Sequence, residues 1–197
     1  LAVAGGHPKG RSLVFGSVGP VEELLCLEEI EEEALERAYS DQAAALGAGG
    51  VDAILCSSFT DLVSLCAAVR AAKRASGLPV IAGMKFDSGA QLNETAMGVT
   101  APQACAALVA VGVDGMGCDV GDSPQSATEI VSLIRSSTSV SIWVRLQAGA
   151  PQLIEGRVEV EQTPCEFAKI GKQLVAAGGK FIGGGRGAGL DNIAALR

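Results

Sequence analysis

The segment FIGGGRGAG (residues 181–189) combines five glycines with one arginine, directly before the helix-like stretch LDNIAALR. Backbone amides at the start of a helix bind anions, and the guanidinium of Arg186 would add further donors. A glycine-rich loop is also a common way to make a tight turn between a strand and a helix. The segment therefore has two interpretations, a cradle for a phosphate or carboxylate and a turn kept for packing, and we favour the turn.

Other residues that could do chemistry are scattered along the chain. Lys85 ends an apolar run and could form a Schiff base with a carbonyl compound, but an ion pair with Asp87 or simple solvation is the favoured interpretation. Asp119 and Asp122 share one segment and could bind a divalent cation or act as acid and base, or could instead cap the next helix. The single histidine, His7, makes a Ser-His-Asp arrangement improbable.

The composition excludes several classes of protein. A formal net charge of −7 leaves no basic stripe for nucleic acid, and the acidic run at 27–37 is interpreted as a solvated helix face. Six cysteines without a C-x-x-C pair indicate reduced thiols and not a disulfide framework. No apolar run is long enough for a membrane span. We expect a protein of the cytoplasm or an organelle interior that is not secreted.

Short apolar runs alternate with longer stretches of helical period, which indicates a parallel sheet covered by helices. The expected strands are 12–17, 51–57, 78–86, 113–120, 140–146 and 180–184. The expected helices are 28–47, 60–76, 101–111, 124–136 and 163–177, with a last one beginning near Asp191. Pro124 and Asp61 are helix-start signals.

Two architectures fit this alternation, a doubly wound open sheet and a TIM-type (β/α) barrel. Every expected strand runs into a loop rich in Gly, Ser, Asp or Pro, which favours the barrel, since its active sites are built at the carboxyl ends of the strands. Only six units are found, whereas a typical barrel has eight in about 250 residues. We therefore predict a single domain over residues 1–197, a partial α/β barrel whose two open sheet edges must be covered or paired.

Six segments carry a family resemblance by their order and spacing: VFGSVGP (14–20), VDAILCSSFTD (51–61), MKFD (84–87), VDGMGCDVGDSP (113–124), LQAGAP (146–151) and FIGGGRGAGLDNI (181–193). The chain resembles the homocysteine S-methyltransferase family, which includes the homocysteine-binding barrel of cobalamin-dependent methionine synthase. The resemblance implies that the six units are the third to the eighth of a barrel whose first two are absent. It also implies methyl transfer to a thiol held by zinc on three cysteines, since a coordinating metal removes the thiol proton.

This chain departs from the family at all three zinc-ligand positions, which are Val120, Gly185 and Arg186 here. The family's Glu-Thr pair is Ser57-Ser58, and its Pro-Asn-Ala-Gly loop is Leu-Gln-Ala-Gly at 146–149. We expect no zinc and interpret Cys56 and Cys118 as core thiols. The residues expected to line a substrate pocket are Ser57, Ser58, Asp119, Gln147, Gly184, Gly185 and Arg186; the catalytic residues stay open.

Two functions follow. The first is methyl transfer to a thiol or other small acceptor without the usual zinc site, for which Arg186 could hold an anion. The second is a non-catalytic barrel remnant that serves as a structural or assembly subunit of a larger complex. The expected partner is a small-molecule substrate or a protein that completes the barrel edges, and no cofactor is expected on this chain. The methyl donor, a corrinoid or another compound, stays open.

Overall fold

A computed structural model describes residues 12–21, 32–120, 124–150, 152–154, 157–160 and 162–197. Its main sheet has six strands in the order β1-β2-β3-β4-β5-β8, and every neighbouring pair is parallel. The strands are β1 (Phe15–Val18), β2 (Ala53–Phe59), β3 (Val80–Lys85), β4 (Gly115–Val120), β5 (Ser141–Leu146) and β8 (Phe181–Gly184). The sequence prediction of six parallel strands is thereby confirmed.

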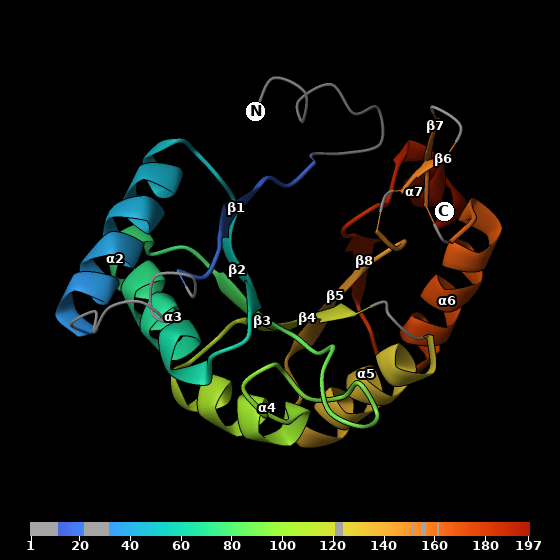
Figure 1. The fold of residues 1–197 in the computed structure, drawn as a ribbon. Helices are drawn as coiled ribbons and strands as arrows, with labels where there is room; N and C mark the ends of the chain where they lie inside the picture. The colour runs from blue at the N-terminus through green and yellow to red at the C-terminus, as the bar shows by residue number, and fades with distance from the viewer. Residues whose placement is uncertain (1–11, 22–31, 121–123, 151, 155–156, 161) are drawn as a thin grey trace.

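The helices follow the strands one by one along the convex face of the curled sheet (Figure 1). They are α2 (Glu32–Ala48), α3 (Leu62–Ser76), α4 (Ala101–Ala110), α5 (Pro124–Ser137), α6 (Pro164–Ala176) and α7 (Leu190–Ala195). A doubly wound sheet has helices on both faces and a reversal in strand order. Helices on one face and a sequential strand order exclude that alternative, and the chain is a half-barrel of six βα units.

The half-barrel is open between β1 and β8, and neither edge strand has an outer partner among the described residues. Aromatic side chains occupy its concave face. The Phe15 and Trp143 rings meet edge to face with centroids 4.8 Å apart, and Phe181 stacks on Trp143 at 5.7 Å. These rings line a hollow of about 410 Å³ on the concave face, which extends to residues at the amino ends of the strands.

One element was not predicted, an antiparallel hairpin of β6 (Gln152–Ile154) and β7 (Arg157–Glu159) inside the connection from β5 to α6. The segment after the hairpin returns to the barrel, because the Gln162 amide donates to the Ala148 carbonyl at 3.0 Å. The hairpin is too short and too polar to give a strand pattern that a single sequence reveals.

The hydrophobic core lies between the convex face of the sheet and the helices. Strand residues that face outward are fully buried there, and they include Cys56 in β2 together with Cys118 and Val120 in β4. Successive residues of a strand point to opposite faces. The two cysteines therefore face the helices and not the barrel interior, which confirms that they are core thiols.

The sequence Gly-Val-Asp stands directly before β2 (residues 50–52) and directly before β4 (residues 112–114), and both copies form the same structure. Asp52 accepts a hydrogen bond from the Val14 amide at 2.8 Å and returns its own amide to the Val14 carbonyl at 2.7 Å. Asp114 does the same with Val80, at 2.8 and 2.9 Å. Each aspartate thus joins the start of its own strand to the neighbouring strand. Both lie at the amino-terminal edge of the barrel, where the residues of TIM barrels contribute to stability and not to catalysis.

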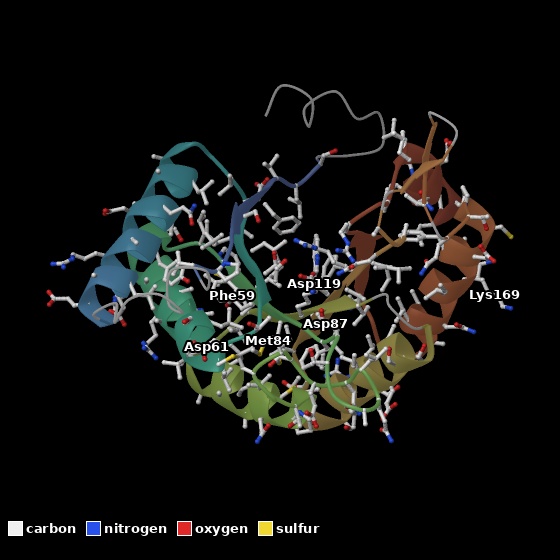
Figure 2. All side chains as sticks on the ribbon, in the orientation of Figure 1. Phe59, Asp61, Met84, Asp87, Asp119 and Lys169 are labelled. Carbon is white, nitrogen blue, oxygen red and sulfur yellow. The ribbon has the colours of Figure 1, made fainter. Side chains whose placement is uncertain are left out.

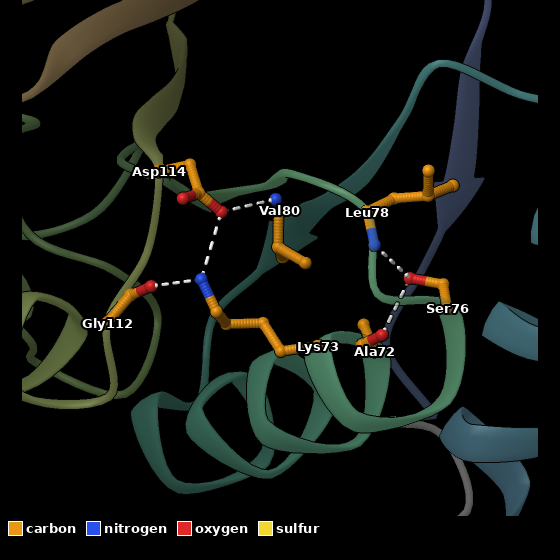
Figure 3. Close-up of polar contacts among 7 residues, drawn as sticks. All are labelled: Ala72, Lys73, Ser76, Leu78, Val80, Gly112 and Asp114. Atoms are coloured by element: carbon orange, nitrogen blue, oxygen red, sulfur yellow. Dashed lines mark hydrogen bonds and ion pairs between the residues drawn. The ribbon is translucent and has the colours of Figure 1, made fainter.

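Lys73 extends the second of these joints (Figure 3). Its ammonium donates to the Gly112 carbonyl at 2.6 Å and to Asp114 at 3.0 Å. Partial burial acts to raise the pKa of Asp114, but the Val80 amide and Lys73 outweigh it and hold that pKa below its ordinary value. Beside this joint, the hydroxyl of Ser76, the last residue of α3, donates to the Ala72 carbonyl and accepts from the Leu78 amide.

Both predicted helix starts hold. The Asp61 carboxylate accepts from the amides of Val63 and Ser64, and Pro124 is the first residue of α5. Of the acidic run, Glu33 and Arg37 form an exposed ion pair on α2, whereas Glu36 faces α3 and pairs with Arg70 and Arg74. Other residues of interest, His7, Cys26 and Asp122, lie outside the described part of the chain, as do residues 28–31 of the predicted helix.

Candidate functional site

A network of charged and hydroxyl side chains crosses the carboxyl-terminal ends of β2, β4 and β5. Asp119 in β4 stands opposite Arg145 in β5, and its Oδ1 lies 3.0 Å from Arg145 Nε. The other two guanidinium nitrogens donate to Ser57 Oγ at 2.9 Å and to Ser58 Oγ at 3.1 Å. Ser58 Oγ in turn donates to Asp119 Oδ2 at 2.7 Å. Four side chains from three strands therefore form one connected polar site.

Ser58 has a strained backbone. Its φ is +69°, in the left-handed region that residues other than glycine seldom adopt, and the β2–β3 register shifts between Cys56 and Phe59. The structure corrects one boundary, because the predicted strand ended at Ser57 whereas β2 extends to Phe59, so that Ser58 lies inside the strand. Such strain persists where the surrounding structure fixes it, and it clusters at functional sites.

Burial dominates the electrostatics of the site. Only 4% of the Asp119 side chain is exposed, whereas Arg145 keeps 28% of its surface exposed. Burial raises the pKa of Asp119 above its ordinary value, although the Arg145 charge, the Ser58 hydroxyl and Lys85 all act to lower it. A carboxylate whose pKa is raised is a better proton acceptor. Asp119 is therefore suited to act as a general base.

Lys85 and Asp87 lie next to this network at the end of β3. Lys85 stands opposite Asp119 in the β3–β4 register and forms an ion pair with Asp87, as the sequence predicted. Figure 2 shows Asp119 and Asp87 on the concave side of the sheet, while Lys169 on α6 points away from the molecule. Two carboxylates and two cations thus face each other at the same edge, and their formal charges cancel.

Gln147 follows β5 on the same side as Arg145, two residues further along. Only 8% of Gln147 is exposed, and its backbone amide donates to the Val120 carbonyl at 2.8 Å. Its Cγ lies 3.3 Å from the point where a Cβ on Gly185 would stand. The Gln147 side chain therefore covers the place that a side chain at position 185 would occupy.

The glycine-rich loop is a tight turn. The amides of Gly185 and Ala188 donate to the Leu146 and Gly185 carbonyls at 2.8 and 3.2 Å. The Gly189 amide donates to Asn192 Oδ1 at 3.0 Å. Arg186 is exposed, and its carbonyl accepts from the Ala148 amide at 2.9 Å. Backbone and side-chain acceptors thus occupy three amides of the loop, which agrees with the packing interpretation favoured from the sequence.

The remaining glycine among the expected site residues, Gly184, serves the same packing. A Cβ there would stand 2.7 Å from the Ala188 Cβ and 2.8 Å from Ile193 Cδ1, so only glycine lets the start of α7 approach β8 this closely. Of the seven residues expected in a pocket, the structure joins Ser57, Ser58 and Asp119 in one network and sets Gln147 against Gly185 beside it. Arg186 lies apart from that network, on the outside of the turn.

The residues at the three positions where the resemblance implies zinc ligands do not fit a metal. Val120 is buried in the apolar core, Gly185 has no side chain, and Arg186 is a cation. Burial raises the pKa of the Cys56 thiol to about 12 and that of Cys118 above its ordinary range. Thiols of this kind stay protonated, and a protonated thiol does not bind zinc. No group of three potential ligands exists among the described residues.

Sequence reasoning missed Arg145, the residue that connects the network. The signal was a single charged residue inside the apolar run VSIWVRL, on the same strand face as Gln147. A charge in a buried strand of a parallel sheet is rare unless it is paired. The position could have been marked from the sequence, but its partners in β2 and β4 could not.

Comparisons with known proteins agree with this architecture. The model of the homocysteine S-methyltransferase family matches residues 2–197. The chain belongs to this family. It is 29% identical over 186 residues to methionine synthase of Mycobacterium tuberculosis and 28% identical over 184 residues to that of Mycobacterium leprae.

Solved structures show the same fold. The apo form of the homocysteine methyltransferase MmuM from Escherichia coli superposes with a TM-score of 0.76 at 20% identity, and its metallated form with 0.77. The chain covers 66% of the former and 64% of the latter, but only 15% of the length of either methionine synthase. No helix of the described residues is long and apolar enough to cross a membrane.

Proposed function

We propose that this chain binds a small polar acceptor at the Asp119–Arg145 site and takes part in methyl transfer to it without zinc. The observation that carries the proposal is the buried carboxylate, raised in pKa, at the carboxyl edge of a barrel from a methyltransferase family. An ion pair and a strained serine hold it there. A position kept only for packing would need no such arrangement.

The reaction requires that the protein position the acceptor and remove its proton. The acceptor, a thiol or another X–H group, loses its proton to the Asp119 carboxylate as its lone pair attacks the methyl carbon, and the donor leaves with the electron pair of the broken bond. Arg145 holds Asp119 in place and limits the rise in its pKa. The methyl donor, a corrinoid or another methylated compound, is a separate partner in this proposal.

Methyl transfer is tested by incubating the purified protein with methylcobalamin, or with a sulfonium donor, and a panel of small thiols and amines that includes homocysteine. Mass spectrometry would detect the methylated product. We expect product with wild type and with Asp41→Asn, an exposed site on α2, and a strong loss with Asp119→Asn. Equal yields from Asp119→Asn and wild type would refute the assigned base.

The open edges support a second candidate, a non-catalytic barrel that serves as a structural or assembly subunit. An unpaired sheet edge presents free backbone N–H and C=O groups that can pair with a strand of another chain. A hollow of about 480 Å³ lies between α6, β8 and α7, beside the edge strand β8, and a partner protein could fill it. This function predicts that the chain is recovered in complex with a protein that completes the barrel. Native mass spectrometry tests it, and a stable monomer that yields methylated product would refute it.

A further inference from the structure

Lys85 lies between two carboxylates at the carboxyl end of β3. Its ammonium forms an ion pair with Asp87, two residues further along the chain. In the β3–β4 register Lys85 is also the direct partner of Asp119, and the Phe86 amide donates to the Asp119 carbonyl at 3.3 Å, which fixes the two backbones side by side. In the described part of the chain, no ion pair or hydrogen bond joins the side chains of Lys85 and Asp119.

The Asp119 carboxylate is within reach of the Lys85 ammonium. Neighbouring strands of a sheet lie about 4.7–4.9 Å apart. Met84 and Cys118 are buried in the core, so the next residue of each strand, Lys85 and Asp119, faces the barrel interior. The Lys85 stem is flexible, and its charge already acts to lower the pKa of Asp119. A change of rotamer is therefore enough to move the ammonium from Asp87 to Asp119.

Solvation explains why the ammonium pairs with Asp87 in this structure. The Asp87 side chain is 20% exposed and that of Lys85 is 34% exposed, whereas that of Asp119 is only 4% exposed. An ammonium that moves onto Asp119 gives up more of its water, and Asp119 already has Arg145 and the Ser58 hydroxyl as partners. Asp87 therefore offers Lys85 a partner at a smaller desolvation cost.

The loop after β3 fixes Asp87 in this position. The Asp87 amide donates to the Glu94 carbonyl at 3.1 Å. The Ser88 amide donates to the same carbonyl at 2.9 Å, and the Ser88 carbonyl accepts from the Glu94 amide at 3.1 Å. The Ser88 hydroxyl also donates to Asp87 Oδ1 at 3.2 Å. Asp87 thus belongs to a folded loop that keeps an anion beside the Lys85 ammonium.

We propose that Lys85 is a positioning residue whose ammonium Asp87 holds away from the Asp119 carboxylate, and that the ammonium moves onto Asp119 when the Asp87 charge is removed. A second cation on Asp119 would stabilise its ionised form and make it a weaker base. Asp87 thus keeps Asp119 basic through Lys85, without contact with the acceptor. The inference rests on the proposed function only in that Asp119 is the base, since the place of the ammonium is a property of the protein itself.

The titration of Asp119 tests the inference. Among the described residues, the groups that face Asp119 are Lys85 of β3, Arg145 of β5 and Ser58 of β2. The pKa of Asp119 is followed by ¹³C NMR of the aspartate carboxyl groups, and Asp119→Asn assigns the signal. Lys85→Met should raise this pKa, because it removes a nearby cation, and Asp87→Asn should lower it. In the Lys85→Met background, Asp87→Asn should have less than about half of the effect that it has when Lys85 is present. Equal effects in both backgrounds would show that Lys85 does not move and would overturn the inference.

The lysine ammonium signals in ¹H–¹⁵N NMR spectra report the place of the cation directly. The Lys85 signal, assigned by its loss in Lys85→Met, should respond strongly to Asp119→Asn in the Asp87→Asn protein and at most weakly when Asp87 is present. Equal responses would contradict the inference. Asp87→Glu keeps the charge and should behave as wild type, whereas Asp87→Ser should repeat the result of Asp87→Asn. Asp114→Asn is the matched control: it breaks a comparable pair with Lys73 at the opposite edge of the barrel and should leave the pKa of Asp119 unchanged.

The inference and the proposed function can fail separately. If the ammonium moves as expected but no methylated product forms, the inference stands and the proposed reaction fails. If product forms and depends on Asp119, but Asp87→Asn has equal effects with and without Lys85, only the inference fails. If both hold, the acid limb of the pH–rate profile should move to lower pH in Asp87→Asn, together with the pKa of Asp119.

Discussion

Arg145→Met tests whether the buried ion pair stabilises the site as the geometry indicates. The change removes the cation and leaves Asp119, which is only 4% exposed, as an uncompensated buried charge. Breaking a buried pair from one side costs about 3–5 kcal/mol. Because 28% of the arginine side chain is exposed, solvent screens part of this interaction, and we expect the lower figure of about 2–3 kcal/mol. For a domain of this size the thermal midpoint should fall by about 4–12 °C.

The loss should depend on pH. Burial already raises the pKa of Asp119 above 3.8, and the loss of Arg145 raises it further. A carboxyl with a higher pKa in the folded than in the unfolded state contributes stability that is fully present below its unfolded pKa and is lost as pH rises through its folded pKa. The deficit of Arg145→Met against wild type is therefore largest at neutral pH and shrinks as the pH falls through the raised pKa of Asp119.

Urea denaturation of wild type, both single variants and the double variant Asp119→Asn/Arg145→Met measures the coupling. Removing both charges leaves no buried ion, so the double variant should lie within about 1 kcal/mol of wild type. Arg74→Met, in an exposed pair with Glu36, is the control and should cost at most about 1 kcal/mol. If the double variant is no more stable than Arg145→Met, the ion pair is not the source of the loss, and the reasoning is refuted.

Three further predictions follow from single contacts. Gly187→Ala should cost more than about 2 kcal/mol in urea denaturation, because its φ is +79° and a Cβ there would overlap the Gly149 carbonyl oxygen; an unchanged midpoint would mean that the turn is not rigid. Asp114→Ala should cost about 1–3 kcal/mol at neutral pH, and, because the pKa of Asp114 is lowered, this loss should vanish as the pH falls through that lowered pKa; a loss independent of pH would contradict the ion pair. Iodoacetamide at pH 8 should modify the exposed Cys165 and spare Cys118 in the native protein, as mass spectrometry of the peptides from a digest of the labelled protein would show; equal labelling would place Cys118 at the surface.

Much of the fold could be predicted from the sequence, because the relevant physics is local. Alternating apolar runs and helical stretches gave the six parallel strands, and the loops after each strand favoured a barrel over a doubly wound sheet. The hairpin β6–β7 was missed, since strands of three residues are too short for a period to emerge. The bulge at Ser58 was missed because no residue type there demands it.

The candidate site was only partly predictable. The resemblance to the family marked Ser57, Ser58, Asp119 and Gln147, and it implied that the positions of the zinc ligands carry other residues. The lone charge in an apolar strand could have marked Arg145, but its partners are 26 to 88 positions away along the chain, and only the register of parallel strands brings them together.

Sequence alone determined the family and the strand–helix alternation, and it has no cysteine at the three positions where the resemblance implies zinc ligands, because these features depend on residue type and spacing. The tertiary structure decided which face each residue occupies. Alternation along β4 sends Cys118 and Val120 into the core and Asp119 into the barrel, where burial raises its pKa. The packing of distant strands brings Ser57, Ser58 and Asp119 to Arg145, because charge and hydrogen bonding act through space and not along the chain.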